Sequence, residues 1–162
     1  MTRSIFIAIL GATLWLSPSK LLAQSLESKL AALETLSPAE RQQRLLEAAK
    51  GEGEAVVYAN MDVTAMKPLT DGFMKRYPSV RATSVHISGA AIITRVEAES
   101  RAGRSLSDVV LSGQLGVLGL LDRKIFARYR SPEREPFRDS SKNKDGLWTA
   151  YMNNVMVSVY NT

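Results

Sequence analysis

Three short apolar runs, each followed by a segment with helical spacing, occupy the middle of this 162-residue chain. The runs cover residues 55–59, 80–87 and 108–111, and the second is rich in β-branched side chains. Strands that alternate with helices pair in parallel, because parallel pairing needs a long crossover whereas antiparallel pairing needs only a tight turn. The sequence therefore predicts an α/β fold with a mostly parallel sheet and helices on both of its faces.

The segments between and after these runs carry apolar residues at helical spacing, over residues 63–77, 90–102 and 114–122. Pro68 removes one backbone hydrogen bond from the first helix, so we expect that helix to start late or to bend. Tyr77-Pro78 is expected to end it, because proline disfavours helical backbone at the residue before it. In the third helix, Leu115, Leu118 and Leu121 fall on one face.

Residues 24–53 are predicted to form a helical extension in front of a domain that covers residues 54–162. Its first helix carries an apolar stripe of Leu26, Leu30, Leu33 and Leu36. Ser37-Pro38-Ala39-Glu40 has the pattern of a capping box with proline at the first helical position. Gly51 is expected to end the second helix.

Residues 1–23 have the layout of a secretory signal peptide. Arg3 supplies the positive charge, residues 5–16 are apolar, Ser17-Pro18-Ser19 breaks the helix, and Ala23 precedes the expected cleavage point. An uncleaved membrane anchor is the alternative, although the apolar stretch is shorter than the roughly 18 residues that span a bilayer. The chain has no cysteine, which excludes disulfides and lipid attachment at cysteine. We expect a periplasmic protein without a lipid anchor.

The charge of the chain does not favour nucleic acid as a partner. The formal net charge is +5, and removal of Arg3 and Lys20 with the predicted signal would lower it to +3. Nucleic-acid binding calls for a clustered basic face. The densest basic stretch, residues 124–134, also contains Glu133, and we interpret it as solvated surface.

The loops at the carboxyl ends of the three strands are the candidate ligand site, because ligands of open parallel sheets bind there. The candidate residues are Asn60, Met61, Asp62, Ser88, Gly89, Ala90, Ser112 and Gly113. Each loop runs into a helix N-terminus, which favours an anion, and the glycines allow a ligand close to the backbone. In the alternative interpretation, Asp62, Ser88 and Ser112 only cap the helices that follow. If Asp62 faces the cleft, it favours a cationic or neutral polar group instead.

No motif for catalysis or metal binding is found in the sequence. His86 is the only histidine, and no His/Asp/Glu cluster has the spacing of metal ligands. The Gly-x-Ser-x-Gly motif of hydrolases and the glycine-rich phosphate-binding motifs are missing. We therefore expect a protein that is not an enzyme and carries no metal or cofactor, with a hydrolase that uses His86 as an alternative.

The C-terminal part is predicted to begin with a polar loop over residues 138–146. Two strand-like runs follow, over residues 147–152 and 155–160, separated by the turn-forming pair Asn153-Asn154. The chain then stops at Asn161-Thr162.

A series of short landmarks runs in order through the chain: Leu36-Ser37-Pro38-Ala39-Glu40-Arg41, Gly53-Glu54-Ala55-Val56-Val57-Tyr58-Ala59, Phe73, Arg76-Tyr77-Pro78, Ser88-Gly89, Arg95, Glu97, Arg101-Ala102-Gly103-Arg104, Ser107-Asp108-Val109-Val110, Tyr129-Arg130-Ser131-Pro132-Glu133, Asp145-Gly146-Leu147-Trp148 and Tyr160-Asn161-Thr162. In order and spacing this series resembles the first lobe of the extracellular solute-binding proteins of ABC transporters, in the family that includes iron(III)-binding proteins. The resemblance covers roughly residues 37–162.

The resemblance implies a lobe of the type II periplasmic-binding-protein fold, ending at the first crossover strand, with the second lobe absent. It implies capture of a small polar or charged solute at the three loops, and delivery to a permease in the inner membrane. The solute would be iron(III), another small ion or an organic molecule. Where some iron-binding members have a histidine, this chain reads Asn60-Met61-Asp62, and the paired tyrosines of the family belong to the second lobe. A stand-alone periplasmic interaction module that encloses no ligand is the alternative function.

Overall fold

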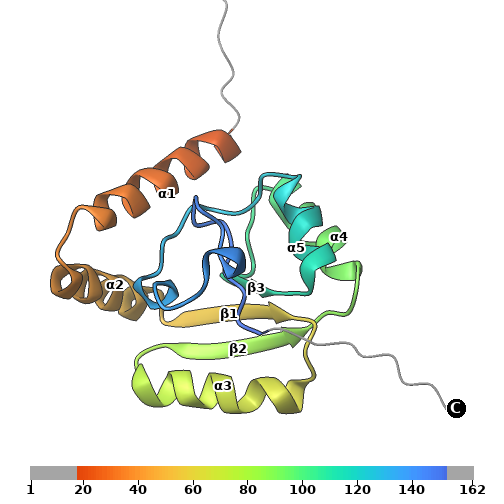
Figure 1. Ribbon diagram of the computed structural model, residues 1–162, viewed down its shortest axis with the longest axis horizontal. Helices are drawn as coiled ribbons and strands as arrows, with labels where there is room; N and C mark the ends of the chain where they lie inside the picture. Colours follow the sequence, from red (N-terminus) through yellow and green to blue (C-terminus); the bar gives the residue numbers. More distant parts are fainter. Residues whose placement is uncertain (1–17, 153–162) are drawn as a thin grey trace, which may run out of the picture.

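The structure is a computed structural model that describes residues 18–152, with side chains described from residue 26 onward. Its elements follow one another as α1 (Pro18–Glu34), α2 (Pro38–Glu52), β1 (Glu54–Ala59), α3 (Val63–Arg76), β2 (Arg81–His86), α4 (Ala91–Arg101), β3 (Val109–Leu111), α5 (Gln114–Leu121) and two short 3₁₀ helices, η1 (Pro132–Arg134) and η2 (Asp139–Ser141). Figure 1 shows this arrangement, with the strands at the centre.

The strands form one parallel sheet in the order β2-β1-β3. β1 pairs with β2 from Glu54↔Arg81 to Ala59↔His86, and with β3 from Val57↔Val109 to Ala59↔Leu111. The chain steps from β1 to β2 in one direction and then back past β1 to β3. Right-handed crossovers therefore place α3 and α4 on opposite faces of the sheet. The prediction of an α/β fold with a parallel sheet and helices on both sides is confirmed (Figure 1).

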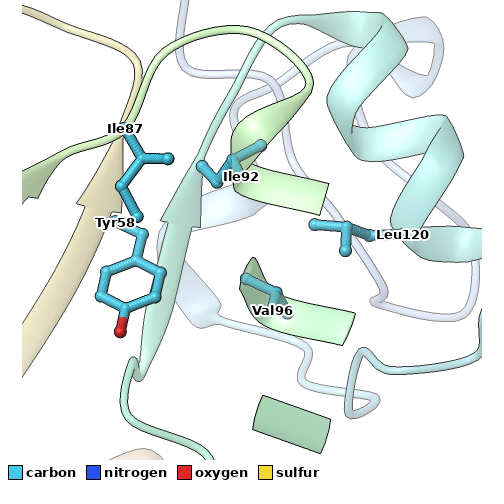
Figure 2. Packing of buried hydrophobic residues seen from close by; sticks show 5 residues of the cluster. All are labelled: Tyr58, Ile87, Ile92, Val96 and Leu120. Carbon is cyan, nitrogen blue, oxygen red and sulfur yellow. The ribbon is translucent and has the colours of Figure 1, made fainter. Parts of the chain in front are cut away.

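The core lies between the sheet and the pair of helices α4 and α5. Its buried side chains, which Figure 2 shows, are Tyr58, Ile87, Ile92, Val96 and Leu120. Tyr58, Ile92 and Leu120 are at most 1% exposed. Full burial of a large aliphatic or aromatic side chain contributes about 1.5–3 kcal/mol, so these residues hold the two helices on the sheet. On the other side of β1, Ala59 and the α3 residue Met66 are also buried.

The helical extension attaches to the domain through α2. Ser37 and Glu40 form the predicted capping box, in which the Ser37 N–H donates to Glu40 Oε2 (3.1 Å). The helix ends at Gly53, with φ of 73°, two residues beyond the predicted Gly51. The Arg41 guanidinium donates to the carbonyl of Arg130 (2.7 Å) and lies 5.3 Å from the ring centre of Tyr129. Every residue of α2 keeps some exposure, as expected for a helix on the outside of the domain.

The first helix begins earlier than the sequence suggests. We expected the helical extension from residue 24, after a break at Pro18, but α1 starts at Pro18 itself. Proline suits this position, because the N–H groups of the first helical residues have no hydrogen-bond partner within the helix. The predicted cleavage point after Ala23 lies inside α1, and cleavage there stays a prediction. Most of the predicted signal, residues 1–17, lies outside the described residues.

α3 begins at Val63, so Pro68 does not delay the start of the helix, and a bend at Pro68 stays a prediction. In α5, Leu115 and Leu118 are 84% and 47% exposed, and the buried residues of this helix are Gly116 and Leu120. Every side of this helix carries leucine, valine or glycine residues of its own, so its sequence does not define one apolar face.

The predicted strand over residues 147–152 is also wrong. Only an isolated antiparallel bridge between Lys142 and Thr149 forms there. The predicted loop before it contains η2, and the Asn143 N–H donates to the Trp148 carbonyl (3.0 Å). The predicted strand over residues 155–160 and the end at Asn161-Thr162 lie outside the described residues. Within the described part, no helix is both long and apolar enough to cross a membrane.

Candidate functional site

The three predicted loops meet at one edge of the sheet. The Ile87 N–H donates to the Ala59 carbonyl (2.8 Å), and the Asn60 N–H donates to the Leu111 carbonyl (3.1 Å). These bonds extend the pairing of β1 with both neighbours to the last strand residues. The loops therefore lie side by side in the order 88–90, 60–62 and 112–113, with the β1 loop in the middle.

Asn60 lies beside the start of α5. A Cβ atom built on Gly113 would stand 3.9 Å from Asn60 Nδ2, an ordinary contact distance. Ser112 packs closely on the first turn of α5, because a Cβ atom at Gly116 would lie only 2.1 Å from Ser112 Oγ. A glycine at position 116 is therefore required for the present position of the Ser112 hydroxyl.

Asp62 caps α3, as the capping interpretation predicts for this residue. Its carboxylate accepts from the Thr64 N–H (2.8 Å) and from the Thr64 hydroxyl. These two hydrogen bonds hold the pKa of Asp62 below its usual value, and the nearby His86 adds a smaller effect in the same direction. Asp62 is exposed, so its negative charge still acts on anything that approaches the β1 loop.

Met61 is held by two side chains from other parts of the chain. His86 Nδ1 lies 2.8 Å from the Met61 carbonyl, and a carbonyl only accepts, so this nitrogen carries a proton and donates. The Tyr151 hydroxyl donates to Met61 Sδ (3.3 Å). The sequence did not indicate Tyr151, which lies 90 positions from Met61 and has no motif around it.

All three residues of the Ser88-Gly89-Ala90 loop are exposed. Gly89 has φ of 53°, in the left-handed region that favours glycine. Ser88 uses its carbonyl, which accepts from the Ala91 N–H (3.2 Å). The N-cap positions of α4 and α5 are Ala90 and Gly113, and among the described residues no side chain caps either helix. The capping interpretation therefore fails for Ser88 and Ser112.

At this edge of the sheet, Asn60, Asp62, Ser88 and Gly89 are all exposed. Two hollows on the described surface lie elsewhere, with volumes of about 320 and 290 Å³. Their lining contains none of the eight predicted site residues. What the edge offers is a row of backbone N–H groups and small polar side chains at two helix N-termini that lack side-chain caps.

The described residues contain no group of three or more His, Cys, Asp and Glu side chains placed to hold a metal ion. His86 binds a backbone carbonyl, so its geometry is that of a residue that positions a loop. No protein-family model matches this chain, and no curated protein matches it significantly. The interpretation of the site therefore depends on its own geometry.

Proposed function

We propose that this chain is the ligand-binding first lobe of an extracellular solute-binding protein, which captures a small polar or charged solute for an ABC permease. The observation that carries the proposal is the meeting of three strand-end loops at the carboxyl edge of the parallel sheet. In open α/β sheets this edge is where ligands bind. The resemblance of the landmark series and the predicted signal peptide support an extracellular role.

The charges at this edge favour a particular kind of solute. The uncapped N-termini of α4 and α5 present N–H groups, which suit an acidic or neutral polar group. The Asp62 carboxylate lies on the neighbouring loop, where it suits a cationic group. A small zwitterionic or polar solute, with its acceptor oxygens toward Gly113 and Ser88, suits both the helix N-termini and the Asp62 carboxylate.

A glycine-to-alanine substitution tests the proposal. Gly113 has φ of −66°, which alanine adopts freely, and the added methyl group makes only an ordinary contact with Asn60. Gly113→Ala should therefore fold normally but crowd the N-terminus of α5, and we expect solute affinity to fall about tenfold. The measurement is thermal unfolding of the full chain with a panel of amino acids, polyamines, sugar phosphates and iron(III).

The matched control is Gly72→Ala on α3, where an added Cβ atom meets nothing within 4 Å. This variant should keep the affinity of the wild-type chain. Equal stabilisation of the wild-type chain and Gly113→Ala by the same solute would contradict binding at this edge.

The exposed apolar side chains around the same edge favour a second function, a periplasmic interaction module. Val63, Leu115, Tyr151 and Met152 are 57%, 84%, 45% and 52% exposed. Val63 and Leu115 lie in the first turns of α3 and α5, next to the candidate loops. Patches of this kind mark interaction sites. Size-exclusion chromatography, together with the thermal unfolding in the presence of the solute panel, distinguishes the two functions. A monomer that a solute stabilises would count against an interaction module.

A further inference from the structure

A basic hollow lies on the described surface, apart from the strand-end loops. It has a volume of about 320 Å³ and is lined by Arg130, Arg134, Glu135, Asp139, Lys142 and Lys144. Four cationic side chains stand against two carboxylates, which leaves a formal excess of two positive charges. The hollow therefore attracts anions.

Arg134 brings a buried positive charge to the wall of this hollow. The residue is only 6% exposed, and its Nη2 group donates to the carbonyl of Asn143. Its Nη1 group is buried and has no hydrogen-bond partner within the described residues. None of the ion pairs of this part of the chain includes Arg134. A buried charge without a counter-charge is costly, so the wall favours an added anion.

The other cations of the hollow form no close ion pair. The Lys142 side chain is 16% exposed. Its ammonium donates to the Glu135 carbonyl (3.3 Å) and lies 3.7 Å from Asp139 Oδ1, beyond good hydrogen-bond distance. The Asp139 side chain is 97% exposed, so water screens this pair strongly. Between residues 26 and 152, no side-chain hydrogen bond or ion pair involves the ammonium of Lys144 or the guanidinium of Arg130.

We propose that this hollow binds a small doubly charged oxyanion of the size of phosphate. The excess of two positive charges matches a dianion. Guanidinium groups present paired N–H donors that fit the oxygens of a phosphate, and lysine adds point charges around it. The site shares no residue with the strand-end loops, so it is independent of the solute site proposed above.

Inorganic phosphate is the probe, applied to the full chain at neutral pH and compared with sodium chloride of equal ionic strength. Thermal unfolding and calorimetric titration should both show binding of phosphate beyond the effect of the salt. Lys144→Gln should weaken the affinity about fivefold, as loss of one exposed charge does. Asp139→Asn should strengthen it by a similar factor, because it removes a repelling carboxylate. Lys75→Gln on α3 is the matched control and should leave the affinity unchanged.

Arg134→Gln should abolish binding, but this substitution also removes a buried side chain and could destabilise the fold. The decisive variants are therefore Lys144→Gln and Asp139→Asn. Opposite shifts of the phosphate affinity in these two variants support the site. The proposal is overturned if phosphate stabilises the chain no more than chloride does. It is also overturned if Lys75→Gln weakens phosphate binding as much as Lys144→Gln, because net charge alone would then explain the effect.

Discussion

Tyr58 is one of the largest fully buried side chains of the described residues. It is 1% exposed, and its hydroxyl donates to Glu99 Oε1 (2.7 Å), which in turn accepts from Arg95 Nε (3.0 Å). The Arg95 guanidinium also lies 4.9 Å from the centre of the Tyr58 ring. One aromatic side chain therefore joins the apolar core of the sheet to a polar cluster on α4.

We expect Tyr58→Phe to lower the free energy of unfolding by about 1–3 kcal/mol, because the Glu99 carboxylate loses a donor in a poorly hydrated place. Urea unfolding of the full chain measures this change. Tyr77→Phe is the control, since it removes a hydroxyl but keeps the ring contact with Phe73, 4.9 Å between centroids. A loss of stability in Tyr77→Phe as large as that in Tyr58→Phe would contradict the role of the cluster.

The same cluster predicts a dependence of stability on pH. Burial alone would raise the pKa of Glu99, but hydrogen bonds from Tyr58, Arg95 and the Leu106 N–H outweigh it and hold the pKa below its ordinary value of 4.5. A lowered pKa in the folded chain stabilises it above the unfolded pKa, and this contribution is lost as the pH falls through the folded pKa. Unfolding in urea at decreasing pH should therefore show a loss of stability below about 4.5. Glu99→Gln should reduce the dependence of stability on pH in this range. If stability falls with pH equally in Glu99→Gln and in the wild-type chain, the role of Glu99 is contradicted.

At the scale of elements, the start of α3 decides the shape of the central loop. Asp62 caps the helix through Thr64, so the chain turns at once from β1 into α3 and places Asn60 and Met61 at the edge of the sheet. Without this cap, the first N–H groups of the helix would have only water as a partner, and Pro68 already removes one helical hydrogen bond.

Asp62→Ala should destabilise the chain, whereas Asp62→Asn should retain most of the stability, because asparagine caps helices about as well as aspartate. Thermal and urea unfolding of the three proteins give the comparison. Equal losses in the alanine and asparagine variants would show that the charge of Asp62, and not its cap, stabilises the loop.

Local signals predicted most elements, and long-range contacts explain the failures. The capping box at Ser37 and the apolar run of β1 depend on neighbouring residues alone, so they are visible in the sequence. The predicted strand over residues 147–152 fails because a strand needs a partner strand, and within residues 18–152 this segment forms only the single bridge between Lys142 and Thr149. The sequence does not indicate which residues of α5 are buried, because nearly all of them are apolar and periodicity does not decide which ones face the core.

For the candidate site too, some features could be predicted from the sequence and others could not. Sheet topology alone was enough to predict that the loops starting at Asn60, Ser88 and Ser112 meet, since parallel strands end at one edge. It could not predict that His86 and Tyr151 hold Met61, because these contacts form between distant parts of the chain. Nor did the sequence indicate that Arg134 is buried, since we took its segment for solvated surface.

At the scale of the whole molecule, two separate regions are suited to small ligands. The strand ends present neutral donors and one carboxylate, whereas the hollow at Arg134 presents an excess of positive charge. A solute bound at the strand ends and a phosphate bound in the hollow should therefore not compete.

Amide chemical shifts of the full chain, recorded by NMR with and without a stabilising solute, show which residues the solute contacts. We expect the shifts to change over residues 60–62, 88–90 and 112–113, and much less in the hollow around Arg134. Changes confined to other parts of the chain, or no change with any solute of the panel, would contradict binding at the strand ends.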